Sequence, residues 1–199
     1  MAKYKDKQFI PALGYNWLTI LYYMAIKITM PEKKFRNRLI EYLNPQTEEQ
    51  ILEFGFGVGH NLTIVIEQNK NTSFIGLDTD PKVKHISQKK FKDLGIEIKL
   101  DLYDGQALPY DDNRFDKVFS SLVFHQLEKE AKLFSLKETH RVLNPNGLFI
   151  IGDWGNPKSI LMRMLFSVVQ ILDGFETTAG NVKGLIPCYM TSMRFMDVT

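Results

Sequence analysis

The chain has 199 residues, of which 44% are hydrophobic and 12% aromatic, so it can bury one ordinary core and fits a single domain. Its net charge of +2, from 25 Lys and Arg against 23 Asp and Glu, gives no field strong enough to indicate nucleic acid or an anionic membrane as a partner. The single cysteine, Cys188, excludes an internal disulfide; with no apolar secretory signal, it favours a cytoplasmic protein.

Two apolar stretches are too short to cross a bilayer, and each contains a cation. Residues 17–30 include Lys27, and residues 160–172 include Arg163. We expect both to form amphipathic helices that cover a core or a pocket. Peripheral membrane contact is the alternative, and stable insertion is not expected.

The rest of the chain alternates short apolar runs with helical stretches, which is typical of a parallel α/β sheet. Pro31 favours the first turn of a helix that ends before Asn44 and Pro45. The residues expected on one apolar face of this helix are Phe35, Leu39, Tyr42 and Leu43.

Five strands are expected, separated by helices. The strands are expected at residues 50–54, 73–78, 96–101, 116–121 and 148–153. The helices between them are expected at 62–68, from a cap at Asp80 to Gly95, and at about 128–143. The segment "NPNG", 144–147, predicts a turn, and residues 173–184 a polar loop. The pattern predicts a doubly wound, mostly parallel sheet with helices on both faces.

Three glycines follow the first expected strand in "ILEFGFGVG", at Gly55, Gly57 and Gly59. Glycine at this place lets a ligand approach the main chain. A dinucleotide site of the G-x-G-x-x-G type would need glycine where His60 stands. The loop contains no Lys or Arg, and Glu53 precedes it, which suits a ligand with a positive amino group better than a pyrophosphate.

Acidic residues recur at the expected carboxyl ends of the first three strands, as Glu53, Asp78 and Asp104. Asp78 can accept both hydroxyls of a ribose, and Asp104 can accept from the exocyclic amine of an adenine. A helix cap or a solvated loop acid is the ordinary interpretation of each. A ligand with an amino acid head, a ribose, an adenine and no phosphate fits all three, and S-adenosylmethionine is such a ligand.

Four segments in sequence order resemble the motifs of class I S-adenosylmethionine-dependent methyltransferases, and are most similar to the C-methyltransferases of ubiquinone and menaquinone biosynthesis. They are "ILEFGFGVG", "FIGLDTDP", "DGQALPYDDNRFDKVFSSLVFHQL" and "RVLNPNGLFIIGDW", within residues 50–154. The resemblance implies a Rossmann-like fold, S-adenosylmethionine as cofactor and a small-molecule methyl acceptor. The aromatic and Met-rich segments that flank the expected site favour an apolar or aromatic acceptor.

The resemblance also implies a set of cofactor-binding residues. Glu53 would hold the amino group through water, Asp78 the ribose, and Asp104 with Gly105 the adenine, while Ser121 would lie near the reacting methyl group. The complete set is Glu53, Gly55, Gly57, Val58, Asp78, Asp104, Gly105 and Ser121.

Methyl transfer from a sulfonium is an in-line displacement with a neutral leaving group, so positioning and desolvation can supply much of the catalysis. His125 falls close to the expected methyl position and is the one candidate proton acceptor. Its alternative is a helix-end histidine bonded to the backbone. The other histidines have no metal-like spacing, and no metal is expected.

This sequence departs from the family pattern in three places. Phe56 replaces a small residue or cysteine, and either narrows the pocket or turns into the core. "NPNG" replaces the more usual Lys-Pro-Gly-Gly turn. Family members finish with an antiparallel strand pair, whereas this sequence ends at "MRFMDVT", 193–199, where the first of those strands would begin.

The sequence therefore predicts one methyltransferase domain in three parts: an N-terminal helical lid at 1–44, a cofactor-binding core at 45–154, and substrate-side helices and a loop at 155–199. A monomer or homodimer is expected. One alternative is a non-catalytic S-adenosylmethionine-binding relative that acts as a scaffold or regulator. A nucleotide-dependent oxidoreductase is disfavoured by His60 and by the absence of a cation in the glycine loop.

Overall fold

The computed structural model describes residues 32–68 and 72–199. The expected helix at 17–30, the expected start at Pro31 and most of the expected N-terminal lid lie outside these residues.

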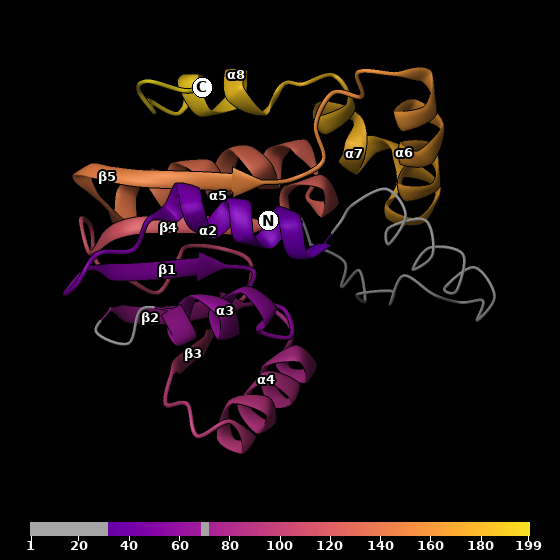
Figure 1. Cartoon of the computed structure of the whole chain (residues 1–199). Coiled ribbons are helices and arrows are strands. Elements are labelled where there is room, and N and C mark those ends of the chain that lie inside the picture. Colours follow the sequence, from indigo (N-terminus) through magenta and orange to yellow (C-terminus); the bar gives the residue numbers. More distant parts are fainter. Residues whose placement is uncertain (1–31, 69–71) are drawn as a thin grey trace, which may run out of the picture.

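A five-stranded parallel sheet forms the centre of the molecule (Figure 1). Its strands are β1 (Gln50–Phe54), β2 (Ser73–Asp78), β3 (Lys99–Leu102), β4 (Phe115–Ser121) and β5 (Leu143–Gly152), in the spatial order β3-β2-β1-β4-β5. Leu52 of β1 pairs with Ile75 of β2 and with Val118 of β4. From β1 the chain first adds β2 and β3 on one side and then β4 and β5 on the other, which confirms the predicted doubly wound α/β fold. In such folds ligands bind at the carboxyl ends of the central strands, where the order reverses.

Helices cover both faces because successive strand residues point to opposite sides. Ile51 and Phe119 share one buried cluster with residues of α2 (Glu32–Leu43), α3 (His60–Gln68) and α4 (Pro81–Asp93). Leu52 and Val118 share the other with α5 (Lys129–Val142), and α8 (Ile186–Ser192) packs against that cluster. Two further helices, α6 (Ile160–Asp173) and α7 (Phe175–Val182), lie beyond the arrowhead of β5 (Figure 1).

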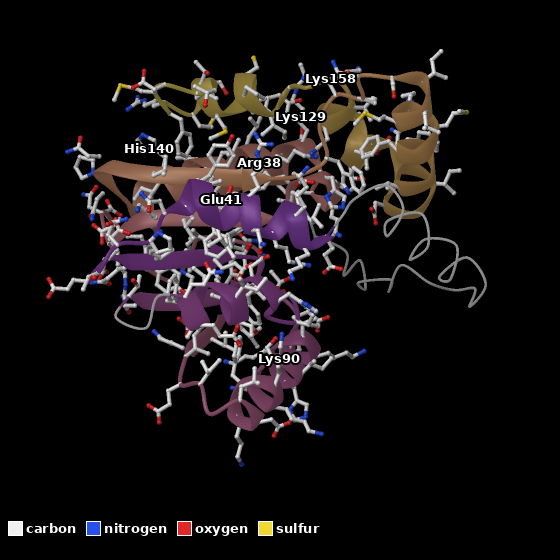
Figure 2. The ribbon with its side chains drawn as sticks, viewed as in Figure 1. Arg38, Glu41, Lys90, Lys129, His140 and Lys158 are labelled. Carbon is white, nitrogen blue, oxygen red and sulfur yellow. The ribbon has the colours of Figure 1, made fainter. Side chains whose placement is uncertain are left out.

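The expected apolar face of the first described helix was partly wrong. Tyr42 is 62% exposed, and Ile40 is buried in its place. Arg38, labelled on α2 in Figure 2, donates to the Tyr42 hydroxyl at 3.2 Å and lies over its ring, and both residues are exposed. Ile40 and Tyr42 lie on either side of the stripe formed by Leu39 and Leu43. Which of the two is buried depends on how the helix packs on the sheet, and the local sequence does not determine that.

Two boundaries differ from prediction because hydrogen bonds redirect the chain. The third strand starts at Lys99 instead of residue 96, since the Ile96 N–H bonds to the Phe91 carbonyl at 2.9 Å and completes the end of α4. The predicted 144–147 turn is wrong, because β5 already begins at Leu143. There Asn144 donates to Asp116 at 2.7 Å, and the segment is an irregularity within the strand pairing.

The predicted polar loop at 173–184 is also wrong, because most of it forms α7. Gly174, with a φ of 97°, separates this helix from α6. In the described part of the chain, the residues after Gly152 form helices α6 to α8 and no strand, so the antiparallel pair is not seen there. No helix within residues 32–68 and 72–199 has the length and apolar character needed to cross a membrane.

Candidate functional site

The glycine loop after β1 turns back on the neighbouring strand, with the N–H groups of Gly55 and Phe56 donating to the Leu77 carbonyl at 2.8 and 3.3 Å. A Cβ on Gly55 would meet a Val123 methyl at 2.3 Å, so this glycine is required by packing. Gly57, with a φ of 51°, has nothing within 4 Å of its Cβ position. Of these two glycines, Gly57 is therefore the one that offers open main chain to a ligand.

Phe56 turns into the core and does not narrow the site. Its side chain is 3% exposed, and its ring occupies the space beside Gly76 of β2, where a Cβ would meet it at 2.8 Å. The structure thus decides between the two expected orientations.

Glu53 is fully buried at the end of β1, with one carboxyl oxygen bonded and the other free of hydrogen bonds. Asn61 of α3 donates to Oε1 at 2.7 Å, and Arg36 of α2 donates to the Asn61 carbonyl oxygen at 2.6 Å. Burial raises the pKa of Glu53 to about 8, and the Asn61 hydrogen bond and the Arg36 charge oppose that shift only in part. A buried carboxyl oxygen with no partner is a suitable contact for a cationic amino group.

Asp78 is held by the backbone on both of its carboxyl oxygens. Oδ2 accepts from the Gly57 N–H at 2.9 Å, while Oδ1 accepts from the N–H groups of Thr79 at 2.7 Å and Asp80 at 3.1 Å. The carboxylate therefore lies against the glycine loop in a fixed orientation, as a hydroxyl-binding acid requires.

Asp104 lies after β3 in an exposed loop, where its Oδ1 accepts from the Gln106 N–H at 2.9 Å. Gly105, with a φ of 82°, has nothing within 4 Å of its Cβ position. Tyr103, which directly precedes Asp104, was not predicted from the sequence. Burial raises the pKa of the Tyr103 phenol, and the charges of Asp78 and Asp104 raise it further. The tyrosine and both acids therefore share one stretch of the sheet edge.

Two cations approach the glycine loop from outside it, although the loop itself has none. Lys90 of α4 (Figure 2) donates to the Gly59 carbonyl at 3.3 Å, and Arg36 is engaged with Glu32 and Asn61. Neither could be placed from the loop sequence, because both come from helices distant in the chain.

At the end of β4, Ser121 has a buried hydroxyl with no hydrogen-bond partner. The next residue, Leu122, has a φ of 58°, which is unusual for a residue with a branched side chain, and its N–H donates to the Gly152 carbonyl at 2.8 Å. This turn directs the chain into η1 (Phe124–Gln126), a single 3₁₀ turn.

His125, in η1, is 1% exposed and lies between two acids. Its Nδ1 is 2.6 Å from Asp153 Oδ1, and its Nε2 is 3.4 Å from Asp173 Oδ2. Burial by itself would lower the pKa of His125, but the hydrogen bond and charge of Asp153, joined by Asp173, raise it to about 9. The sequence offered a signal for Asp153, an acid directly after a strand, but none for Asp173, whose segment was expected to be a loop.

The edge therefore brings together Glu53, Gly57, Val58, Asp78 and Ser121 around the ends of β1, β2 and β4, with Asp104 and Gly105 after β3. Within residues 32–68 and 72–199, no group of three His, Cys, Asp or Glu side chains could hold a metal ion. The orphaned Glu53 oxygen, the open Gly57 and the fixed Asp78 carboxylate fit an amino acid head and a ribose. The glycine loop itself contains no Lys or Arg to bind a pyrophosphate.

Comparison with known proteins identifies a family model described as a methyltransferase domain, which matches residues 52–151, half of the chain. The ubiquinone/menaquinone biosynthesis C-methyltransferase UbiE of Blochmanniella pennsylvanica is 37% identical over 103 residues, 49% of this chain and 39% of that protein. A demethylmenaquinone methyltransferase of Bacteroides fragilis is 25% identical over 69% of this chain and 56% of its own length. The chain spans about half the length of such relatives or less.

Solved structures show the same fold. A SAM dependent methyltransferase from Aquifex aeolicus superposes with a TM-score of 0.57 at 19% identity, over 70% of this chain and 76% of that one. A putative methyltransferase from Bacillus halodurans gives a TM-score of 0.60 at 16% identity, over 75% and 66% of the two chains.

Proposed function

The chain belongs to the methyltransferase domain family, and we propose that it transfers the methyl group of S-adenosylmethionine to a small apolar or aromatic acceptor. S-adenosylmethionine is the cofactor that this family membership implies. The observation that carries the proposal is the Glu53 carboxyl, whose unpartnered, fully buried oxygen lies in the same edge as the open Gly57 and the fixed Asp78.

Each proposed contact with the cofactor follows from the side chains at this edge. Glu53 Oε2 would take the amino group, since no other hydrogen bond satisfies it. Asp78 would take the ribose hydroxyls with the lone pairs that its three backbone donors leave free. Asp104 and Gly105 would border the adenine beside Tyr103, and Ser121 would face the transferred group.

When bound, S-adenosylmethionine supplies a sulfonium methyl group whose leaving group departs neutral. The chain contributes binding, orientation and exclusion of water, which suffice for much of the rate acceleration in such a displacement. The buried Ser121 hydroxyl, with its hydrogen-bonding capacity unused, can orient the acceptor. Methyl transfer to a carbon, oxygen or nitrogen that carries hydrogen also releases one proton, which would pass to solvent.

The character of the acceptor is inferred from the elements beyond β5. Trp154 and Phe166 pack with ring centroids 5.6 Å apart. One side of α6 exposes large apolar residues, with Ile160 at 81% and Ile171 at 67%. Apolar surface on this side suits an apolar or aromatic acceptor, and it also suits peripheral contact with a membrane that holds such a molecule.

Two of the relatives are named for methylation of ubiquinone or menaquinone precursors, and quinol-like phenols are therefore the first acceptors to test. The expected lid at residues 1–44 is part of this proposal, as are a cytoplasmic location and a monomeric or homodimeric state.

Isothermal titration with S-adenosylhomocysteine and with NAD tests the cofactor assignment. We expect S-adenosylhomocysteine to bind and NAD not to bind. The Asp78→Ala variant should bind S-adenosylhomocysteine at least tenfold more weakly, a loss of about 1.4 kcal/mol in binding free energy. Equal affinity in Asp78→Ala, or binding of NAD in its place, would count against the site. Radiolabelled methyl transfer to a panel of phenols, quinols and amines tests catalysis; retained cofactor affinity with no transfer to any of them would favour a scaffold or regulator.

A further inference from the structure

One side of His125 is fixed by a strongly engaged carboxylate. Asp153 Oδ1 accepts from the Trp154 N–H at 2.7 Å and lies 2.6 Å from His125 Nδ1, while Oδ2 accepts from the His125 N–H at 3.0 Å. Asp153 acts as the acceptor in each contact, so the Nδ1 atom must carry a proton.

The other side of the ring faces a second carboxylate. His125 Nε2 and Asp173 Oδ2 are 3.4 Å apart, within ion-pair distance; both are buried, and neither makes a hydrogen bond, to the other or to any other group. Without a proton on either atom, two lone-pair acceptors would face each other in a site of low polarity, which is unfavourable by several kcal/mol in general. A proton on Nε2 replaces this repulsion with an ion pair between the ring and Asp173.

We infer that His125 is an imidazolium cation that forms ion pairs with Asp153 and Asp173. This triad holds the α6–α7 hairpin, the pair of helices α6 and α7 joined at Gly174, against the carboxyl edge of the sheet. The three residues come from η1, from the position after β5 and from the last residue of α6. His125 is then a positioning residue for the acceptor side of the site and is not a free base.

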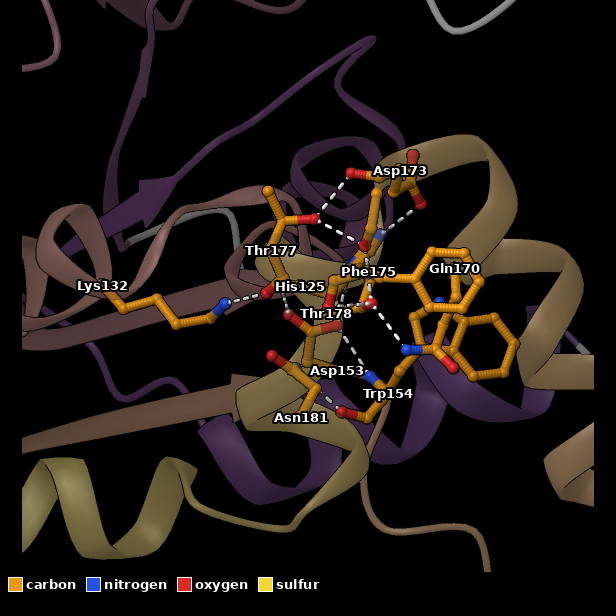
Figure 3. A network of polar contacts seen from close by, with 11 residues as sticks. His125, Lys132, Asp153, Trp154, Gln170, Asp173, Phe175, Thr177, Thr178 and Asn181 are labelled. Carbon is orange, nitrogen blue, oxygen red and sulfur yellow. Dashed lines mark hydrogen bonds and ion pairs between the residues drawn. The ribbon is translucent and has the colours of Figure 1, made fainter.

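The balance of buried charge supports the cationic form. Lys132 of α5 is 1% exposed, and its ammonium donates to the carbonyls of Leu127, at 2.6 Å, and Thr177 (Figure 3). Two carboxylates are thus matched by two cations when His125 is protonated. A neutral imidazole would leave one negative charge uncompensated among buried residues.

The pKa of His125 agrees with this assignment. Burial lowers it, but the contacts to Asp153 and Asp173 outweigh burial and raise it to about 9. Burial lowers the pKa of Lys132 to about 8, which the charge of Asp153 opposes, so this group also remains mostly protonated at neutral pH. Asp153 and Asp173 contact the ring from the position after β5 and from the end of α6, and Lys132 of α5 interacts with the charge of Asp153.

Neutral hydrogen bonds extend the connection between the hairpin and the sheet (Figure 3). Asn181 of α7 donates to the Trp154 carbonyl at 2.9 Å, and Gln170 of α6 donates to Thr178 of α7 at 3.1 Å. The Asn181 bond thus joins the hairpin to the segment after β5, whereas the Gln170 bond holds α6 and α7 to each other. Its role in placing an acceptor rests on the proposed function; the ionic triad itself does not.

The protonation state can be observed directly in the full-length protein labelled with ¹⁵N-histidine. Long-range ¹H–¹⁵N spectra distinguish an imidazolium from either neutral tautomer, and His125→Gln identifies the signal among the four histidines. We expect both nitrogens to be protonated from pH 6.5 to 8. A neutral-tautomer spectrum of His125 in that range, recorded on the unmodified protein, would overturn the inference.

Asp173→Asn tests the fastening role, with Asp93→Asn on the exposed end of α4 as the matched control. In Asp173→Asn we expect the His125 pKa to fall by at least one unit and the amides of α6 and α7 to exchange with deuterium at least tenfold faster. Amide exchange in strands β1 and β2 should be unchanged. Equal exchange in α6 and α7 in both variants would refute the fastening role. Neither the spectra nor the exchange needs cofactor or acceptor, so this failure is distinguishable from failure of the proposed function.

Discussion

Glu53 makes cofactor binding sensitive to pH. Burial raises the pKa of this carboxyl to about 8 in the free protein, so at pH 7 about 90% of the molecules hold a proton there. A ligand ammonium placed beside Oε2 favours the carboxylate and lowers that pKa. Binding of S-adenosylhomocysteine should therefore release about 0.9 proton per molecule at pH 7.

The same linkage fixes the size of the pH effect. Below pH 8 the ligand must displace a proton, so its affinity should fall up to tenfold per pH unit, or about 1.4 kcal/mol. The free protein should respond in the opposite sense. Because the folded-state pKa of Glu53 lies above its ordinary value of 4.5, its contribution to folding is complete below pH 4.5 and is lost as the pH rises through about 8.

Titration calorimetry in phosphate and in Tris at the same pH measures the released proton, because the two buffers differ in ionisation enthalpy. Glu53→Gln should abolish the buffer dependence and most of the pH dependence of the affinity, whereas Glu41→Gln on the exposed face of α2 should retain both. Absence of proton release by the unmodified protein at pH 7 would show that the ligand amino group does not meet a protonated Glu53.

The remaining predictions concern neighbouring positions. Gly55→Ala should lower the free energy of unfolding by about 2 kcal/mol or more in urea titrations, because the new methyl meets Val123 and the φ of 78° is strained. Gly57→Ala should cost only about 1 kcal/mol but weaken S-adenosylhomocysteine binding, and equal effects of the two would contradict their different surroundings. The unmodified protein should have a higher free energy of unfolding than His125→Gln, because the pKa of His125 in the folded protein lies above its ordinary value of 6.5. This difference should be greatest below pH 6.5 and should fall by about 3 kcal/mol as the pH rises through 9. Urea titrations at several pH values measure it.

The cofactor side of the site was predictable because its determinants lie close together in the sequence. The strands at 50–54 and 73–78 have the predicted bounds, and Asp80 caps α4 by accepting from the Lys82 N–H at 2.7 Å as its position before Pro81 predicts. Strand ends and caps depend on a few consecutive residues, so local patterns suffice to place Asp78 beside the glycine loop.

The acceptor side was not predictable because its determinants are tertiary. The α7 sequence is polar, and its buried residues Thr178 and Asn181 find partners 8 and 27 positions away, in Gln170 and the Trp154 carbonyl. Nothing in residues 173–184 alone distinguishes such a helix from a solvated loop. The same holds for Asp173, which becomes informative only once the fold brings it to His125.

The two sides meet in one short connection, residues 121–125. Val123 fills the space that a side chain at Gly55 would need, and two residues later His125 is paired with Asp153 and Asp173. This connection runs from Ser121, the last residue of β4, into η1, and it contacts both the glycine loop and the α6–α7 hairpin. Because the connection is packed at both ends, a shift of the hairpin should also displace the glycine loop. An acceptor that orders the hairpin should therefore raise the affinity of the protein for the cofactor.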